Sequence, residues 1–276
     1  MRHSCVLFFG VLIASFALPA HAAEDWRIEK FESAVVVLKD NTILVTESLT
    51  VFFASPKHGI VRDIPTYEVD LDILGVANEA GQGLPYQLEW SVGWGTGERY
   101  TYRRIRIGDP KIEVQGRHVY VIRYRIAWAL GFLEDYDELY WNVTGDKWPV
   151  PIAQVVSGVT LPEDLSPDQL KTRCLTGSAG STTENCSINI MDSKTIRYEA
   201  MGLELNEGLT VVAGFPKGLV KEPTSVERLL RQLRICITLA TIPLLTLLRM
   251  LVLWVRPVAI LGRSAASRLS GIPQRT

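Results

Sequence analysis

The stretch VYVIRYRIAW, residues 119–128, alternates between two kinds of side chain. One face of the extended chain carries Tyr120, Ile122, Tyr124, Ile126 and Trp128, while Arg123 and Arg125 fall on the other. A period of two indicates a β-strand with one buried face and one face in water.

Runs of the same character lie on both sides of this strand. Residues 33–38 and 43–53 are rich in β-branched side chains, and the turn residues KDNT at 39–42 between them predict a hairpin. Further strand candidates, separated by Gly, Pro, Asn and Asp, are residues 59–64, 67–74, 86–92, 102–107, 138–143, 151–161, 195–200 and 209–215. Many short strands with few helical periods predict an all-β domain with an immunoglobulin-like β-sandwich fold.

Both ends of the chain carry targeting features. Residues 1–22 run from a basic start through an apolar stretch to the small-residue site AHA, the layout of a secretory signal peptide cleaved after Ala22. Residues 235–255 are apolar except for threonines, a proline and Arg249. At 1.5 Å per residue, a helix of this length crosses roughly 30 Å of hydrocarbon, so we expect one transmembrane helix.

These features predict a single-pass cell membrane protein whose N-terminal domain lies outside the cytoplasm, in the periplasm or the extracellular space. The expected parts are the signal peptide at 1–22, the β-sandwich domain at 23–220, a linker and juxtamembrane helix at 221–234, the transmembrane helix at 235–255 and a short basic cytoplasmic tail at 256–276. The cleaved signal exports the N-terminal side first, and arginines after the span favour a cytoplasmic C-terminus. Arg249 either snorkels toward the interface or pairs with an acidic group on another membrane helix.

Charge is distributed unevenly along the chain. Residues 23–227 hold 20 Lys and Arg against 30 Asp and Glu, a net charge of −10, whereas residues 228–276 hold eight Arg and no acid. An acidic exported domain repels the phosphates of nucleic acid, so no nucleic-acid partner is expected. The predicted partners are the membrane and another membrane or envelope protein.

Cysteine positions predict a disulfide. In an oxidising compartment, Cys174 and Cys186 are expected to close a short polar loop rich in Gly, Ser and Thr. A metal site would require further ligands close to these cysteines, and no histidine follows His118. We therefore predict neither a metal nor a cofactor.

A series of motifs resembles a known family. The motifs are HGIVRDIP at 58–65, RIRIGD at 104–109, GRHVY at 116–120, LYWNVTGDKWPVPI at 139–152 and LTVVAGFPKG at 209–218. Together, and in this order, they resemble the exported domain of the DUF2207 family of predicted membrane proteins. The chain is similar to a member of this family with a short C-terminal part. The resemblance implies a signal, a β-rich extracytoplasmic domain and membrane helices, in a family without an established function.

The motifs contain nine candidates for a binding or structural role, which are His58, Arg62, Asp63, Arg106, Asp109, Trp141, Asn142, Asp146 and Trp148. Arg62 and Asp63 fall on opposite faces of a strand and are expected to tie a loop to a neighbouring strand. The two tryptophans around the Gly-Asp turn either stack on a sugar or peptide in a shallow groove or pack against the core.

Two classes of function follow from these candidates. The first is a membrane-anchored binding or structural module of the cell envelope. The alternative is an envelope hydrolase that uses His58, Asp63, Asp109 and Asp146, because a histidine can exchange protons near neutral pH and a carboxylate can orient it. The sequence favours a module that is not an enzyme, since it contains no recognisable nucleophile elbow, metal-ligand set or phosphate loop. No catalytic residue is predicted.

Overall fold

The computed structural model describes residues 25–66, 69–95, 98–233 and 249. The chain divides into two compact units, Met1–Lys221 and Glu222–Thr276, each of which is considered by itself. The predicted signal peptide, the predicted membrane span apart from Arg249 and the predicted tail lie outside the described residues. In the described ranges, no helix is long and apolar enough to cross a membrane.

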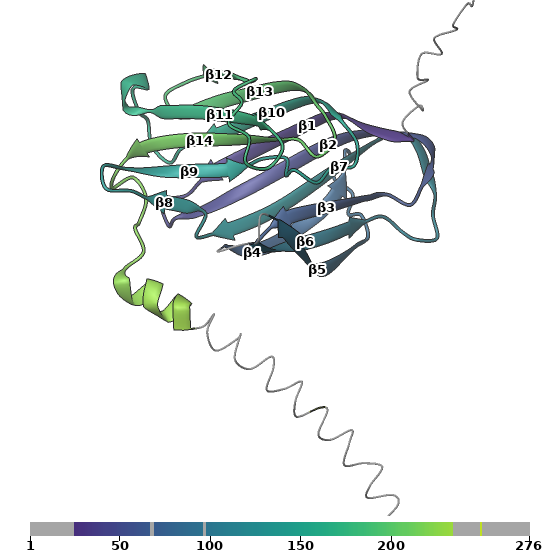
Figure 1. Cartoon of the computed structure of the whole chain (residues 1–276), viewed down its shortest axis with the longest axis horizontal. Helices are drawn as coiled ribbons and strands as arrows, with labels where there is room; N and C mark the ends of the chain where they lie inside the picture. Colours follow the sequence, from purple (N-terminus) through teal and green to yellow (C-terminus); the bar gives the residue numbers. More distant parts are fainter. Residues whose placement is uncertain (1–24, 67–68, 96–97, 234–248, 250–276) are drawn as a thin grey trace, which may run out of the picture. The chain divides into compact units, whose positions relative to one another are not determined.

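Apart from one 3₁₀ turn, the regular elements in the described part of the first unit are all β-strands (Figure 1). They are β1 (Trp26–Val37), β2 (Thr42–Lys57), β3 (Ile60–Pro65), β4 (Asp70–Asn78), β5 (Tyr86–Gly95), β6 (Glu98–Ile107), β7 (Val114–Ala127), β8 (Leu130–Phe132), β9 (Tyr136–Asn142), β10 (Ile152–Thr160), β11 (Lys171–Gly177), β12 (Ser187–Ile190), β13 (Thr195–Leu203) and β14 (Gly208–Pro216), with a 3₁₀ turn at Pro167–Gln169. The predicted all-β class is confirmed.

The strands form three sheets. The largest has the order β12-β13-β10-β1-β2-β7-β4, the second β11-β14-β9-β8 and the third β3-β6-β5. β1 and β10 pair in parallel, although most of the chain's strands separate them in sequence. The immunoglobulin-like arrangement of two sheets is not confirmed, because the strands form three sheets and the largest includes this parallel pair.

Alternating side chains explain the large sheet. In β7, Tyr120, Ile122, Tyr124 and Ile126 are buried. The predicted hairpin is confirmed as β1 and β2, which pair antiparallel. Asn41 occupies the left-handed region in the turn between them, with a φ of 65°, a conformation that asparagine tolerates better than most residues.

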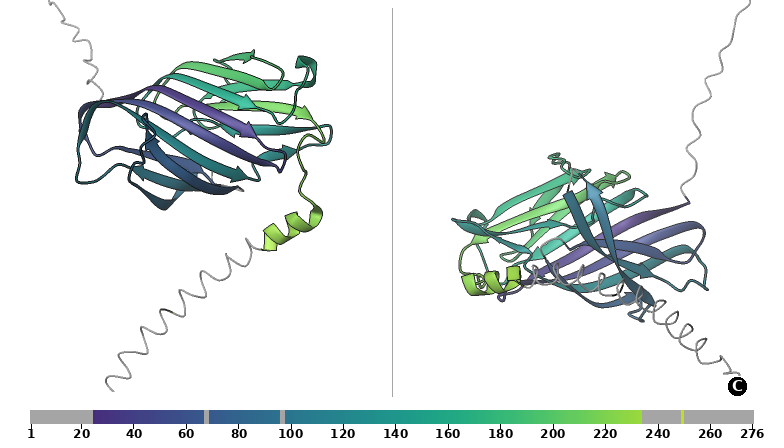
Figure 2. Two further views of the ribbon diagram at one scale, coloured as in Figure 1. Left: turned by 180° about the vertical axis from the view of Figure 1, so that it is seen from behind. Right: turned by 60° about the horizontal axis from the view of Figure 1, so that its bottom comes forward.

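One face of the large sheet carries both smaller sheets. The cross-strand register places Tyr198, Ser157, Ser33, Glu47 and Ile122 in one row, and residues directly opposite each other point to the same side. In this row, the Tyr198 hydroxyl donates to a backbone oxygen of β14 and Glu47 accepts hydrogen bonds from a side chain of β3. The two smaller sheets therefore cover different parts of the same face, and the view from behind shows the purple strands β1 and β2 running across the front of the domain (Figure 2).

The predicted disulfide between Cys174 and Cys186 is present. Cys174 is a buried residue of β11, and Cys186 directly precedes β12. The bridge thus joins the edge strand of the second sheet to the edge strand of the large sheet.

The described part of the second unit is a helix at residues 225–233. Its N-terminus is capped reciprocally, because the Thr224 amide donates to Glu227 Oε2 over 2.7 Å and the Glu227 amide donates to Thr224 Oγ1 over 3.2 Å.

Candidate functional site

Arg62 is among the largest fully buried side chains of the β domain, at 1% exposure. Its Nε and Nη2 donate to the two carboxylate oxygens of Glu47 over 2.8 and 2.6 Å. Nη2 also donates to the Val143 carbonyl over 3.1 Å, while Nη1 donates to the carbonyls of Thr144 over 2.6 Å and Asp63 over 3.0 Å. A guanidinium has five N–H donors, and all five are used.

The surroundings of Arg62 fix its charge. Burial alone lowers the pKa of this guanidinium, and the Glu47 carboxylate raises it by more, so that the pKa lies above its ordinary value. Burial and the Glu47 charge also raise the pKa of Tyr124, whose hydroxyl donates to Glu47 Oε1 over 2.5 Å. Neither Arg62 nor Tyr124 exchanges protons near neutral pH. These two side chains therefore keep their protons, and their contacts with Glu47 hold the fold together.

The Arg62 cluster joins all three sheets. Arg62 belongs to β3 and Glu47 to β2, and the carbonyls of Val143 and Thr144 belong to the loop after β9. Gly145 gives the guanidinium room, because a Cβ there would lie 2.9 Å from Nη1.

A pair of glycines explains two of the sequence motifs. Gly59 precedes β3 and Gly108 follows β6, both with φ in the left-handed range, at 124° and 127°. A Cβ on Gly59 would lie 1.9 Å from the Ile107 carbonyl oxygen, and one on Gly108 would lie 1.9 Å from that of His58. The two backbones can approach this closely only without side chains.

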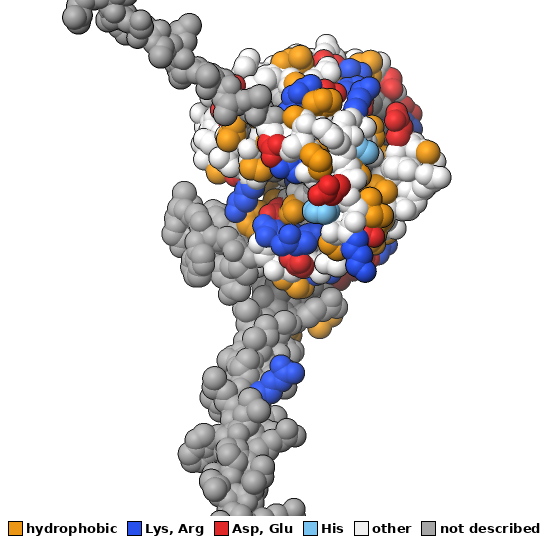
Figure 3. Space-filling model, turned by 90° about the vertical axis from the view of Figure 1, so that its right-hand side faces the viewer, with side chains coloured by type: hydrophobic (Ala, Val, Ile, Leu, Met, Phe, Trp, Pro, Cys, Tyr) orange, Lys and Arg blue, Asp and Glu red, His pale blue; other side chains and the backbone are white. Residues whose placement is uncertain are grey.

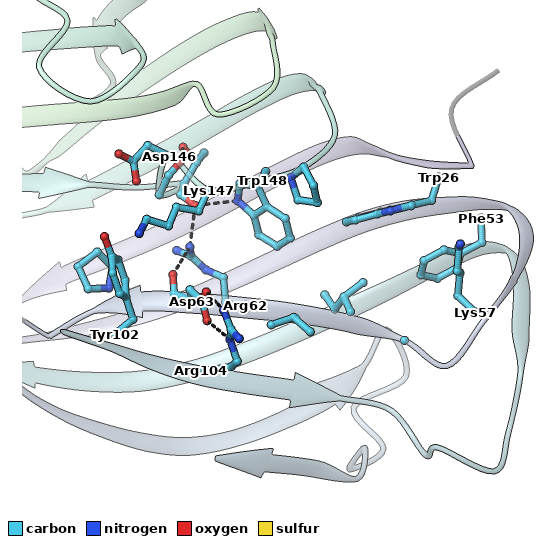
Figure 4. Close-up of a pocket in the computed structure, with 17 residues that line it drawn as sticks. Trp26, Phe53, Lys57, Arg62, Asp63, Tyr102, Arg104, Asp146, Lys147 and Trp148 are labelled. Carbon is cyan, nitrogen blue, oxygen red and sulfur yellow. Dashed lines mark hydrogen bonds and ion pairs between the residues drawn. The ribbon is translucent and has the colours of Figure 1, made fainter. Parts of the chain in front are cut away.

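A groove of about 390 Å³ lies beside this cluster, and we call it the Trp148 groove. It is lined by Trp26, Phe53, Lys57, Gly59, Ile60, Val61, Arg62, Asp63, Pro65, Tyr102, Arg104, Thr144, Gly145, Asp146, Lys147, Trp148 and Pro149. Figure 4 shows that Trp26 and Phe53 lie at one end and Tyr102 and Asp146 at the other, with Trp148 between them. The lining combines aromatic rings with charges of both signs.

Some of the charges in the groove are occupied. Asp63 is half-buried and accepts two hydrogen bonds from Arg104, from Nε over 2.8 Å and from Nη2 over 2.7 Å. Lys57 pairs with Asp25.

Two neighbouring charges remain available. Lys147 is exposed, and its Nζ lies 4.0 Å from the ring centre of Tyr102. Asp146 is half-buried, and among the described residues its side chain has neither a hydrogen bond nor an ion pair. The Asp146 and Lys147 side chains can therefore bind a ligand without first breaking an ion pair.

The four hydrolase candidates are not gathered in one place. Asp63 and Asp146 line the Trp148 groove, but His58 and Asp109 do not. His58 Nδ1 donates to the Ile112 carbonyl oxygen over 3.1 Å, and His58 lines an adjoining pocket of about 250 Å³ that shares Lys57, Gly59, Ile60 and Val61 with the groove. Asp109 accepts the backbone N–H two residues later over 2.8 Å, which is a turn interaction.

The other candidates divide between groove and scaffold. Arg106 lines the same small pocket as His58 and pairs with Glu89 over 2.8 Å. Trp141 is buried and does not line the Trp148 groove. Asn142 Oδ1 accepts the Gly145 amide over 2.9 Å and so shapes the loop after β9.

Trp148 itself has both roles. It is 4% exposed, its Nε1 donates to the Thr144 carbonyl over 2.8 Å, and its ring centre lies 6.3 Å from that of Phe31 and 6.4 Å from that of Trp26. It packs against the core and also forms part of the groove wall.

Several residues of the site were absent from the predicted set, and one of them left a signal. Glu47 lies on the same face of its strand as Ile43, Val45 and Leu49, because side chains two residues apart point to the same side. The sequence pattern therefore places an acidic residue on the buried face. A buried acid requires a buried cation. Trp26, Tyr102 and Lys147 left no such local signal, because the groove forms only when four separate segments meet.

The described residues show no candidate metal site. No group of three His, Cys, Asp or Glu side chains in the described ranges could hold a metal ion. On the face seen in Figure 3, acidic, basic and hydrophobic side chains are interspersed.

Comparisons with known proteins give one family and one curated relative. The family described as "Predicted membrane protein (DUF2207) N-terminal domain" matches residues 27–215. The "Uncharacterized protein YciQ" of Escherichia coli K12 is 27% identical over 245 residues, which cover 81% of this chain and 36% of that relative. The chain therefore spans about a third of the relative's length.

Solved structures show only weak similarity. An M1 zinc metallopeptidase from Deinococcus radiodurans matches with a TM-score of 0.37 and 9% identity, over 69% of this chain and 42% of that one. The native leukotriene A4 hydrolase from Saccharomyces cerevisiae matches with a TM-score of 0.39 and 10% identity, over 69% and 29%. Similarity at this level supports no conclusion about function.

Proposed function

The chain belongs to the DUF2207 family of predicted membrane proteins, and from this membership we propose that its β domain is a recognition module, anchored in the membrane and exposed outside the cytoplasm, that binds a component of the cell envelope in the Trp148 groove. The signal peptide predicted at 1–22 and the membrane helix predicted at 235–255 support this location. The disulfide between Cys174 and Cys186 supports the location, because such bonds persist in oxidising compartments.

The observation that carries this proposal is the contrast between the groove's buried and accessible groups. Every N–H of Arg62 is used inside the protein, and Asp63 is held by Arg104. The accessible groups are the half-buried ring of Trp26 and the side chains of Asp146 and Lys147, while Phe53, Tyr102 and Trp148 form the groove wall with 1%, 7% and 4% of their surface exposed. Aromatic rings with a few fixed polar groups are typical of a site that recognises a ligand.

The same contrast argues against the envelope hydrolase. A general base must reach the proton that it removes, and His58 lies outside the groove that contains Asp146. The carboxylate of Asp63 already accepts both bonds from one arginine.

A charge reversal in the groove tests the proposal. The full chain, tagged and solubilised from membranes, is used to recover its partner with Lys147→Glu and, as a control, with Lys194→Glu, which also removes the exposed ion pair of Lys194 with Asp164. Lys194 lies between β12 and β13, close to the pair Ile190 and Ile196. The register of the large sheet places this pair at the opposite end from Trp26 and Ile28 of β1.

We expect Lys147→Glu to reduce recovery of the partner about tenfold, which corresponds to about 1.4 kcal/mol of binding free energy. Lys194→Glu should recover the wild-type amount. Equal recovery with both variants would contradict binding in the groove.

A further inference from the structure

We propose that the helix at residues 225–233 lies on the membrane surface, with its apolar side inserted at the boundary between lipid headgroups and acyl chains. This inference concerns the second unit alone and does not depend on the Trp148 groove.

An exposed apolar stripe runs along this helix. Val226, Leu229, Leu230 and Leu233 are 64%, 55%, 60% and 48% exposed. Their spacing of i, i+3, i+4 and i+7 places them on one side of a helix with 3.6 residues per turn. Four large aliphatic side chains thus face outward together, and no described part of the chain covers them.

The opposite side of the helix is polar. Ser225, Glu227, Arg228, Arg231 and Gln232 occupy the remaining positions. Arg228 donates to Glu222 over 2.6 Å and to the Pro223 carbonyl over 3.1 Å, which holds its stem along the start of the helix. A short helix with leucines on one side and arginines on the other has the character of an interfacial membrane helix.

The sequence after the helix identifies lipid as the partner. The helix is followed, after Arg234, by the 21-residue apolar run at 235–255, so a bilayer that holds this run is next to the helix. Glu227 is the last acidic residue of the chain, and eight arginines lie from Arg228 onward. This one-sided charge complements anionic headgroups.

A second copy of the chain fits the stripe less well. A stable protein interface buries roughly 800 Å² on each partner. Four partly exposed side chains on nine residues are too few to supply such an area, whereas insertion into lipid has no minimum area.

Spin labels in the full chain test the proposal. The chain is reconstituted into nanodiscs of phosphatidylcholine and phosphatidylglycerol, with Cys236 replaced by serine. A label is placed by Leu230→Cys on the stripe or, as the matched control, by Gln232→Cys, two residues and about 200° further around the helix. Collision with oxygen, which concentrates in lipid, is compared with collision with a nickel chelate, which stays in water.

We expect the ratio of oxygen to nickel collisions to be several-fold higher at position 230 than at position 232. Equal access to the nickel chelate at both positions would place the stripe in water and overturn the proposal. Protection of position 230 from both reagents would show that protein covers the stripe, and this also overturns it. Both substitutions are at exposed positions, and circular dichroism of each variant checks that the β domain is folded.

Discussion

Replacement of Arg62 by methionine should destabilise the β domain more than any surface change. The substitution leaves the fully buried Glu47 carboxylate with only the Tyr124 hydroxyl as a partner. Removing one partner of a buried ion pair costs about 3–5 kcal/mol. The carbonyl of Val143 also loses its side-chain donor, at about 1–3 kcal/mol for a buried unsatisfied group, part of which relaxation recovers.

We therefore expect a loss of at least about 4 kcal/mol in the free energy of unfolding, a large part of the 5–15 kcal/mol that is typical of folded proteins at roughly room temperature. The assay is urea unfolding of the chain ending at Lys221, which retains every described strand, followed by tryptophan fluorescence. The double variant Arg62→Met/Glu47→Leu should be more stable than Arg62→Met, because it buries no unpaired charge.

Arg104→Met is the matched control. Arg104 makes the same bidentate contact with a carboxylate, that of Asp63, but its side chain is 32% exposed. Its loss should be clearly smaller than that of Arg62→Met, roughly 1–2 kcal/mol, because both side chains keep contact with water, at 32% and 14% exposure. If Arg62→Met cost no more than this control, or if the double variant were the least stable protein, the structural role assigned to the Arg62 cluster would be refuted.

Three further predictions concern the same domain. Gly145→Ala and Gly81→Ala both place a Cβ at positive φ, but only position 145 meets the buried guanidinium, so its loss in urea unfolding should exceed that at position 81 by about 1–3 kcal/mol. Burial raises the pKa of Tyr120 from 10.0 to about 12, so the folded state retains its proton longer than the unfolded state. The stability that the buried, protonated Tyr120 contributes is complete below pH 10 and is lost as the pH rises through about 12. The unfolding free energy of Tyr120→Phe should therefore fall less than that of the wild type over that range. Replacing both Cys174 and Cys186 by serine opens a loop with a sequence separation of 12 and should cost about 3 kcal/mol, and reductant should lower the urea midpoint of the wild type but not that of the variant.

Local patterns were sufficient to predict most strands. The alternation in β7 and the turn chemistry before β2 are written in adjacent residues, and both were predicted. β11 and β12 were missed because they flank a loop rich in Gly, Ser and Thr and lie at sheet edges. β4 was predicted about three residues too early, at 67–74.

The arrangement of the sheets was beyond local reasoning. The parallel pairing of β1 with β10 joins segments that are far apart in sequence, and no turn between them reveals it. The immunoglobulin-like prediction rested on the number of short strands and implied two sheets. In the structure, β3, β5 and β6 instead leave the large sheet to form a third.

The candidate site was predictable in part. Arg62, Asp63, Asp146 and Trp148 were singled out from two motifs, and all four line one groove. The sequence did not reveal that Arg62 is a buried structural residue while Asp146 is accessible in the groove. The role of Arg62 depends on Glu47, which lies on another strand.

Photo-crosslinking tests recognition in the Trp148 groove most directly. A photoreactive amino acid is placed at Lys147 or at Val61, which is 40% exposed in the groove, and at Met191, which is 57% exposed beside the far end of the large sheet. The proteins are irradiated in intact membranes, and the crosslinked products are compared. We predict the same envelope component crosslinked from positions 147 and 61 and not from position 191. Crosslinking from position 191 alone, or no product from either groove position, would contradict the proposed function.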